Sequence, residues 1–231
     1  MTRWGYLSFA LVVAGFGIAV GAQMTADQIP GDKVAIHWNI RGQPDGWALK
    51  SQPFLAFYLL PTVFGGVIVL GLLLLPWLSP QNFKVEGFRR IFDYVFFLVA
   101  ALFVYLQAVI TWSQLHGPVM MDRALLAGIF LFFALIGNVL GKVKRNFWMG
   151  VRTPWTLADP VVWDRTHRMA AWLMVITGVV GCALSLAGVS PIVCFVLLMV
   201  GALTPVLYSL VLYKRLERQG RLESQQTAAA E

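Results

Sequence analysis

Long apolar segments alternate with short polar ones along the 231 residues of the chain. About 20 helical residues cross the hydrocarbon core of a membrane, and several runs come close to that length. The shorter segments of alternating polarity that a transmembrane β-barrel needs are absent from the sequence. We therefore expect an all-α, polytopic membrane bundle with about six transmembrane helices, at Trp4–Met24, Phe54–Leu78, Phe92–Trp112, Ala124–Leu140, Met169–Gly188 and Pro191–Tyr213.

The composition agrees with a membrane protein. The chain is 58% hydrophobic and 13% charged, with a mean hydropathy of +0.71. Because about half of any folded surface is already apolar, a soluble domain of this size has too little interior for so many apolar side chains. Charged residues do not fall deep in any predicted span, and Asp93 and Asp122 lie at span ends. Intramembrane carboxylates usually mark proton and ion pathways, so this pattern argues against an ion-coupled pump.

The basic residues are divided unevenly between the two sides of the predicted bundle. Of the 18 Lys and Arg, only Lys33, Arg41, Lys50 and Arg123 fall on one side, which leaves 14 for the other. Short cytoplasmic loops are enriched in basic residues, so we expect both termini in the cytoplasm. The net charge of +7 then reflects membrane topology and anionic headgroups. It does not indicate direct binding of nucleic acid.

The first span also has the features of a signal peptide. Arg3 gives a basic start, Leu7–Val20 an apolar run, and Val20–Ala22 a cleavage site of small residues. The apolar stretch is nevertheless long enough to span a membrane. We expect it to be retained, and its cleavage would leave the orientation of the other spans unchanged.

The longest segment on the outer side, residues 25–53, is rich in aromatic and turn-forming residues. The composition of Val34–Asn39 predicts a short strand, and Pro44-Asp45-Gly46 predicts the turn that follows it, so we expect a small extracytoplasmic hairpin. One histidine with scattered carboxylates falls short of a metal-ligand set, and no metal is expected. The candidates for sensing an extracellular ligand are His37, Trp38, Asn39, Asp45 and Trp47. The alternative is a hydrogen-bonded turn that only covers the helix ends.

Residues 137–168 are the chemically densest part of the chain, with three Trp and one His between basic residues. Asp159 and Pro160 predict the start of a helix that continues into the fifth span. At helical spacing Trp163 and His167 share a face, and Asp164 can pair with Arg168. The candidates for a structured cytoplasmic site that binds a ligand or partner are Asn138, Asn146, Arg152, Trp155, Asp164 and His167. The alternative is an interfacial belt, with Trp at headgroup level and basic residues facing anionic lipid.

Known catalytic motifs are not recognisable in the chain. It has no phosphate-binding loop, no zinc-protease helix and no Gly-x-Ser-x-Gly elbow. Asp164 and His167 are a conceivable acid–base pair, since histidine titrates near neutrality. We expect neither a cofactor nor catalysis; the alternative is a membrane-embedded enzyme that uses Asp164 and His167.

Several of these motifs resemble those of a known family. The run from Gly150 through Arg152-Thr-Pro-Trp155, with Asn146 before it and His167 after it, is similar to the signature of the SdpI-type immunity proteins. The outer segment from Ile29-Pro30 to Trp47 resembles the domain of unknown function commonly fused ahead of that signature. The resemblance covers most of the chain in the expected order.

The resemblance implies a multi-pass protein of the bacterial cytoplasmic membrane. The named member of the family protects producer cells from a secreted killing peptide and holds a cytoplasmic repressor at the membrane. The implied partners are therefore the lipid bilayer, a secreted peptide toxin and a cytoplasmic transcriptional repressor. The implied units are a two-span unit (1–80), an SdpI-like four-span unit (81–213) and a polar tail (214–231). A membrane carrier or lipid- or solute-handling protein is the alternative, since Pro and Gly in the second span can mark a mobile element.

Overall fold

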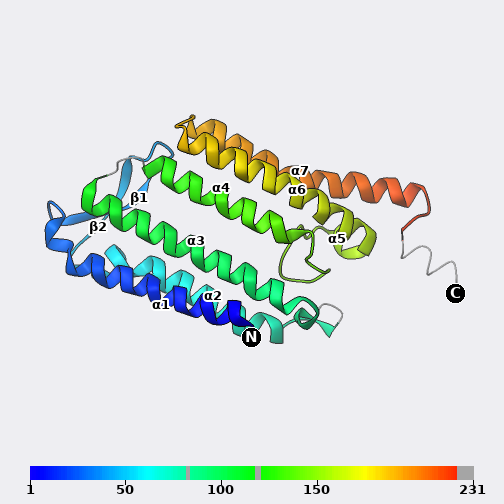
Figure 1. Cartoon of the computed structure of the whole chain (residues 1–231), viewed down its shortest axis with the longest axis horizontal. Helices are drawn as coiled ribbons and strands as arrows, with labels where there is room; N and C mark the ends of the chain where they lie inside the picture. Colours follow the sequence, from blue (N-terminus) through cyan, green and yellow to red (C-terminus); the bar gives the residue numbers. More distant parts are fainter. Residues whose placement is uncertain (82–83, 118–120, 223–231) are drawn as a thin grey trace.

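Six long helices lie side by side in the computed structural model, which describes residues 1–81, 84–117 and 121–222 (Figure 1). They are α1 (Arg3–Met24), α2 (Leu59–Trp77), α3 (Arg89–His116), α4 (Met121–Leu140), α6 (Pro160–Leu186) and α7 (Pro191–Arg218). The short helices are η1 (Ala26–Gln28), η2 (Phe54–Tyr58), η4 (Val85–Phe88) and α5 (Pro154–Ala158). Each long helix, α2 and α3 together with the short helix before it, is long and apolar enough to cross a membrane. The predicted all-α membrane bundle is confirmed.

Some helices extend well beyond the apolar runs that predict them. The helix α6 begins at Pro160, because the side chain of Asp159 accepts a hydrogen bond from the Val162 amide at 3.0 Å. Proline suits the first helical position, where its missing N–H is not needed. The helix start that the sequence predicts here is confirmed. At the other end of the chain α7 continues to Arg218, beyond the last predicted span.

The helices pack in two groups that meet along α3 and α4. The helices α1, α2 and α3 contact one another, as α4, α6 and α7 do (Figure 1). Glycines set the approach of α4 to α6. A Cβ at Gly178 would lie 2.5 Å from the amide nitrogen of Ala134, and one at Gly137 would lie 2.9 Å from the carbonyl oxygen of Ala171. Small residues permit such backbone contact between membrane helices, which makes α4 and α6 a closely packed pair.

The outward sides of the helices are apolar. Val13 of α1, Val67 of α2 and Leu207 of α7 are each more than half exposed. Lipid tails cover such side chains in a bilayer, while each helix satisfies its own backbone hydrogen bonds. The chain is therefore an integral membrane protein whose helices contact lipid.

The expected hairpin forms, with β1 (Lys33–Trp38) antiparallel to β2 (Pro44–Leu49). Its turn lies at residues 39–43. The side-chain oxygen of Asn39 accepts hydrogen bonds from the amides of Arg41 and Gln43, at 2.8 and 3.1 Å. Gly42 takes a φ of +71°, in the left-handed region that favours glycine. Asparagine and glycine therefore build this turn together.

The prediction that Pro44-Asp45-Gly46 forms the turn is wrong, because these residues lie in β2. Gly46 pairs with His37 where the register of the two strands is irregular. A Cβ at Gly46 would lie 2.8 Å from the Cβ of His37. Glycine in a strand often marks such a close approach of two backbones. Gly46 therefore permits strand pairing next to His37 and does not form a turn.

The hairpin and the segment between α4 and α6 lie at opposite ends of the bundle (Figure 1). The N-terminus and the end of α7 lie at the end with α5, away from β1 and β2. The hairpin is fixed to α3, because the Gln114 side-chain nitrogen donates to the Ala35 carbonyl at 2.8 Å. It also touches α4, since a Cβ at Gly42 would lie 3.0 Å from the amide nitrogen of Asp122.

Candidate functional site

The candidate site is the segment that links α4 to α6, residues 141–159, which we call the α4–α6 loop. Asn146 lies at its centre and is fully buried. Its side-chain nitrogen donates to the carbonyls of Lys144 and Met149, at 2.9 and 3.0 Å. Its oxygen accepts from the amides of Trp148 and Met149, at 2.7 and 2.8 Å. One amide side chain thus uses both of its polar atoms to shape the loop.

His167, in the second turn of α6, fixes the next part of the loop. Its Nε2 accepts a hydrogen bond from the Val151 amide at 3.0 Å, and its Nδ1 lies 2.8 Å from the Trp163 carbonyl. A nitrogen that accepts carries no proton, so this arrangement fits the neutral imidazole protonated on Nδ1. Gly150 lies against the Nε2 edge of the ring and has a φ of +111°. The histidine is therefore a buried support for the loop backbone.

Trp163 continues this support one turn earlier in α6. Its indole nitrogen donates to the carbonyl of Val143 at 2.8 Å, and its ring stacks on His167 with centroids 3.9 Å apart. The expected shared face of Trp163 and His167 is confirmed by this stack. Both rings are buried between the loop and the helix.

The second half of the loop is joined to α7. Thr153 and Thr156 form a capping box at the start of α5, in which each side chain bonds to the other's backbone. The Trp155 indole nitrogen donates to the Ser209 hydroxyl of α7. The hydroxyls of Thr153 and Ser209 are 3.3 Å apart. The loop is thus held by α6 on one side and by α7 on the other.

The remaining predicted residues of this end are exposed. Arg152 donates to the Trp148 carbonyl at 3.1 Å and lies over the ring of Phe147, with its guanidinium carbon 5.1 Å from the centroid. Asp164 and Asn138 are exposed as well. The ion pair expected between Asp164 and Arg168 is not among those that the described residues form. The six candidates therefore divide into buried or partly buried supports (Asn146, Trp155, His167) and exposed side chains (Asn138, Arg152, Asp164).

This division gives a first prediction. His167→Phe should lower the free energy of unfolding by about 1–3 kcal/mol, because it leaves the partly buried amide of Val151 without an acceptor. Asp164→Asn, on the exposed side of the same helix, should change it by less than about 0.5 kcal/mol. Thermal unfolding of the purified protein in detergent measures both. Equal effects of the two substitutions would show that His167 does not support the loop.

The hairpin residues form a separate group at the opposite end of the bundle. His37 and Asp45 face each other across the strands, with Nδ1 and Oδ1 2.5 Å apart, and both are exposed. Trp47 is 55% exposed. Asn39 makes the turn, and Trp38 is half-buried. The structure therefore brings the hairpin candidates together with one another, and keeps them apart from the α4–α6 loop.

Sequence reasoning did not anticipate a buried ion pair at the loop end of α3. Asp93 is fully buried, and one carboxylate oxygen accepts from Arg89 at 2.7 Å while the other accepts from the Thr2 amide at 2.6 Å. Arg89 also donates to the Leu72 carbonyl at 3.2 Å. The four-residue spacing of Arg89 and Asp93 was the available signal. The pair connects α1, α2 and α3.

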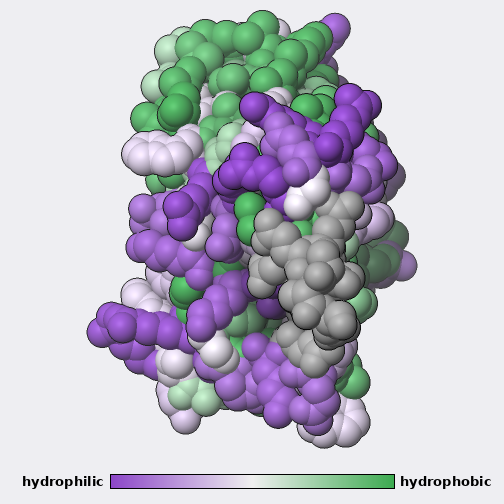
Figure 2. Space-filling view, turned by 90° about the vertical axis from the view of Figure 1, so that its right-hand side faces the viewer, coloured by the Kyte–Doolittle hydropathy of each residue, from purple (hydrophilic) through white to green (hydrophobic). Residues whose placement is uncertain are grey.

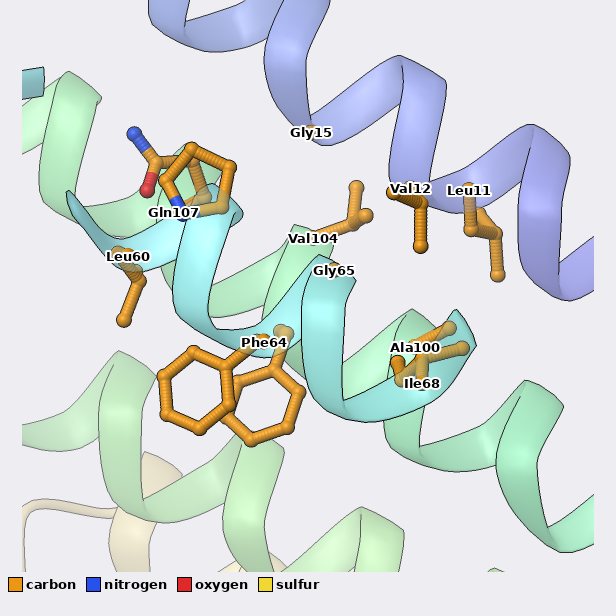
Figure 3. Close-up of a pocket in the computed structure, with 12 residues that line it drawn as sticks. Leu11, Val12, Gly15, Leu60, Phe64, Gly65, Ile68, Ala100, Val104 and Gln107 are labelled. Carbon is orange, nitrogen blue, oxygen red and sulfur yellow. The ribbon is translucent and has the colours of Figure 1, made fainter. Parts of the chain in front are cut away.

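The core between α1, α2 and α3 contains a small apolar pocket lined by Leu11, Phe64 and Ile68, among others (Figure 3). It has room for about 20 Å³, which is enough for one water molecule. Gln107 faces this pocket, and its side-chain oxygen has no hydrogen-bond partner among the described residues. A larger apolar hollow of about 320 Å³ lies beside it, near the hairpin end, and is also lined by Gln107 and by Gln114.

Comparison with known proteins identifies two segments of the chain. Residues 142–209 match the SdpI/YfhL protein family, and residues 10–64 match a domain of unknown function, DUF1648. The chain thus carries an SdpI/YfhL region behind a DUF1648 region. This confirms the resemblance that the motifs predict.

One relative of known name is the Immunity protein SdpI of Bacillus subtilis (strain 168), which is 33% identical over 72 residues. The aligned part is 31% of this chain and 35% of the relative, so the match covers about a third of each protein. No solved structure matches the chain.

Each matched segment contains the structured segment at one end of the bundle, together with membrane-spanning helices. The SdpI/YfhL region contains almost all of the α4–α6 loop, α5, α6 and much of α7. The DUF1648 region contains most of α1, the whole hairpin and the beginning of α2. Of the candidates, Asn138 alone lies outside both regions. The SdpI/YfhL region is therefore the part in which Asn146, Trp155 and His167 hold the loop.

Proposed function

We propose that the protein is an immunity receptor of the bacterial cytoplasmic membrane, which protects its cell from a secreted antibacterial peptide without catalysis of its own. The observation that carries the proposal is the SdpI/YfhL match over residues 142–209, together with the relative named as an immunity protein. Within that segment the side chains hold a shaped loop and leave a few polar groups exposed, which suits recognition of a partner.

We propose the orientation from the distribution of charge. The end with α5, the start of α1 and the end of α7 carries 14 of the 18 basic residues, and the hairpin end carries the other four. Basic loops stay in the cytoplasm, so the α4–α6 loop faces the cytoplasm and the hairpin faces outward. A reporter enzyme fused after Arg152 tests this orientation. Activity of the reporter on the extracytoplasmic side would contradict it.

The outward hairpin then meets the toxin, and the α4–α6 loop meets a cytoplasmic repressor. On the hairpin, the exposed Trp47 and the His37–Asp45 pair offer an aromatic face and a charge. On the loop, Arg152 uses one of its five N–H groups for a described hydrogen bond, so most of its planar donor edge is available. Arg152 is therefore the residue on which the partner interaction is best tested.

The direct test is to delete the gene and challenge the cells with a panel of secreted antibacterial peptides. We expect increased sensitivity to at least one peptide, and restoration by the wild-type gene. Unchanged sensitivity, with no cytoplasmic protein retained in a pull-down, would contradict the proposal.

Substituting Arg152 separates a role in recognition from a role in stability. Arg152→Lys keeps the charge but loses the planar donor, so we expect protection and partner retention to fall at least about tenfold. Unfolding should change by less than about 0.5 kcal/mol, because the side chain is exposed. Arg165→Lys, an exposed control in α6, should leave both unchanged. If the Arg152→Lys variant protected cells normally, Arg152 would be an ordinary interfacial charge.

A carrier of small solutes or lipids is the second candidate. It is favoured by the 320 Å³ hollow near the hairpin, where the unpaired Gln107 oxygen offers a polar contact in an apolar wall. The pocket in Figure 3 opposes it, because about 20 Å³ is too small for a substrate. Uptake or flipping by the purified protein in vesicles would favour the carrier over the receptor.

A further inference from the structure

A groove lies between α4 and α6 at the end of the α4–α6 loop, outside the buried network described above. It has a volume of about 350 Å³. Its polar lining comes from Asn138, Lys142 and Arg168, and its apolar lining includes Ala171, Trp172 and Val175. The groove is thus basic at one end and apolar at the other.

Among the residues that the structure describes, the two cations of the groove have no partner. Lys142 and Arg168 are exposed, and neither forms an ion pair or a side-chain hydrogen bond with a described residue. Asp164, one turn before Arg168, is the acidic side chain nearest along α6, and it does not pair with Arg168. Two unneutralised cations on either side of one groove favour an anion between them.

Close packing of the helices brings these cations together. Gly137 and Gly141 form the α4 side of the groove floor. A Cβ at Gly141 would lie 3.5 Å from the Cβ of Ala171 and 3.8 Å from the Cα of Arg168. The first residue after Gly141 is Lys142, so its side chain begins beside the turn of α6 that carries Arg168. The floor is therefore built from two backbones in contact.

The position of the groove relative to the membrane identifies its occupant. Trp172 is 71% exposed and follows Arg168 by one helical turn toward the middle of α6. Tryptophan prefers the headgroup level of a bilayer, and lysine and arginine extend toward the polar side of that level. Figure 2 shows that hydrophilic residues cover this end of the molecule and that apolar residues lie beyond them. A ligand here meets cations first and hydrocarbon next.

We propose that this groove binds one anionic glycerophospholipid, with its phosphate between Lys142 and Arg168 and its acyl chains along Trp172 and Val175. Basic pockets between membrane helices are known binding sites for anionic headgroups. Asn138 adds a neutral hydrogen-bond donor for the ester or glycerol oxygens of the lipid. The proposal does not depend on the immunity function, because it concerns the lipid-facing side of α4 and α6.

The test compares two double variants that remove the same charge. The full-length protein is reconstituted in nanodiscs of phosphatidylcholine with a minor fraction of phosphatidylglycerol, and the lipid retained after extraction is counted by native mass spectrometry. We expect one retained phosphatidylglycerol on the wild type, and at least about tenfold less on Lys142→Gln/Arg168→Gln. Lys144→Gln/Arg165→Gln, which removes two exposed cations of the same end, should retain it like the wild type.

Any of the following results would contradict the proposal. Equal loss in both double variants would show diffuse surface charge, and equal retention in both would show that the groove is not the site. Displacement of the lipid by millimolar glycerol 3-phosphate would show a site for a soluble phosphate compound. Because a loss could arise from misfolding, thermal unfolding is measured on each variant. As a second readout, Trp172→Ala should lower retention of the lipid without changing the unfolding temperature.

Discussion

Gly150→Ala is expected to dislodge the α4–α6 loop from α6. Gly150 has a φ of +111°, which an alanine adopts only with strain, and a Cβ there would lie 2.2 Å from the Nε2 of His167. The backbone strain costs roughly 1–3 kcal/mol. The overlap adds about 1–3 kcal/mol more, because the imidazole is bonded on both sides and cannot move aside. Limited proteolysis within residues 141–159 and thermal unfolding in detergent measure the effect.

Gly66→Ala is the matched control for this substitution. Gly66 lies in α2, has no left-handed φ, and a Cβ at this position would meet nothing within 4 Å. Alanine is preferred over glycine in a helix by about 1 kcal/mol, so the control should be neutral or slightly stabilising. If Gly150→Ala behaved like Gly66→Ala, the close contact between the loop and His167 would be refuted.

Asp93→Ala is expected to lower the free energy of unfolding by about 3–5 kcal/mol, the cost of breaking a buried pair by removing one partner. The substitution leaves the Arg89 guanidinium, 25% exposed, without its carboxylate, and it leaves the Thr2 amide without an acceptor. Among the described residues, Arg89 would keep the Leu72 carbonyl as a hydrogen-bond acceptor and its contact with the ring of Phe92. Because the pair connects α1, α2 and α3, the loss of stability should appear in the unfolding of these three helices together.

The exposed pair of Lys214 and Glu217 provides the comparison. Its atoms are 2.8 Å apart, but both side chains are more than a third exposed. Glu217→Ala should therefore cost no more than about 1 kcal/mol, and the cost should shrink in high salt. If Asp93→Ala lowered the free energy of unfolding by no more than Glu217→Ala does, the buried pair would contribute nothing beyond an ordinary surface pair.

The features that the sequence predicted well are local ones. Apolar length predicts the six spans, because a bilayer requires about 20 helical residues regardless of what packs against them. Asp159 and Pro160 predict the start of α6, because a cap involves only the first turn of the helix. The turn of the hairpin was misplaced because two local signals competed, and the side chain of Asn39 bonds the backbone at residues 39–43.

The candidate site was only partly predictable, because its bonds join residues that are distant along the chain. The Trp155 indole reaches Ser209, and the Trp148 indole reaches Ser79 at 2.6 Å. Nothing in the spacing of these residues indicates such contacts. Composition therefore predicted which residue types gather in the α4–α6 loop, but not that Asn146 and His167 are buried supports while Arg152 is exposed.

The close packing of α4 against α6 at their glycines limits how a structural change at one membrane surface is transmitted to the other. The hairpin touches the first turn of α4, and the last turn of α4 leads into the α4–α6 loop. The 20 residues of α4 span about 30 Å, so this helix is a stiff rod between the two ends. With backbones in contact at Gly137 and Gly178, the rod cannot slide past its neighbour without breaking that contact. A signal that crosses the protein through α4 must therefore shift α4 and α6 together as one body.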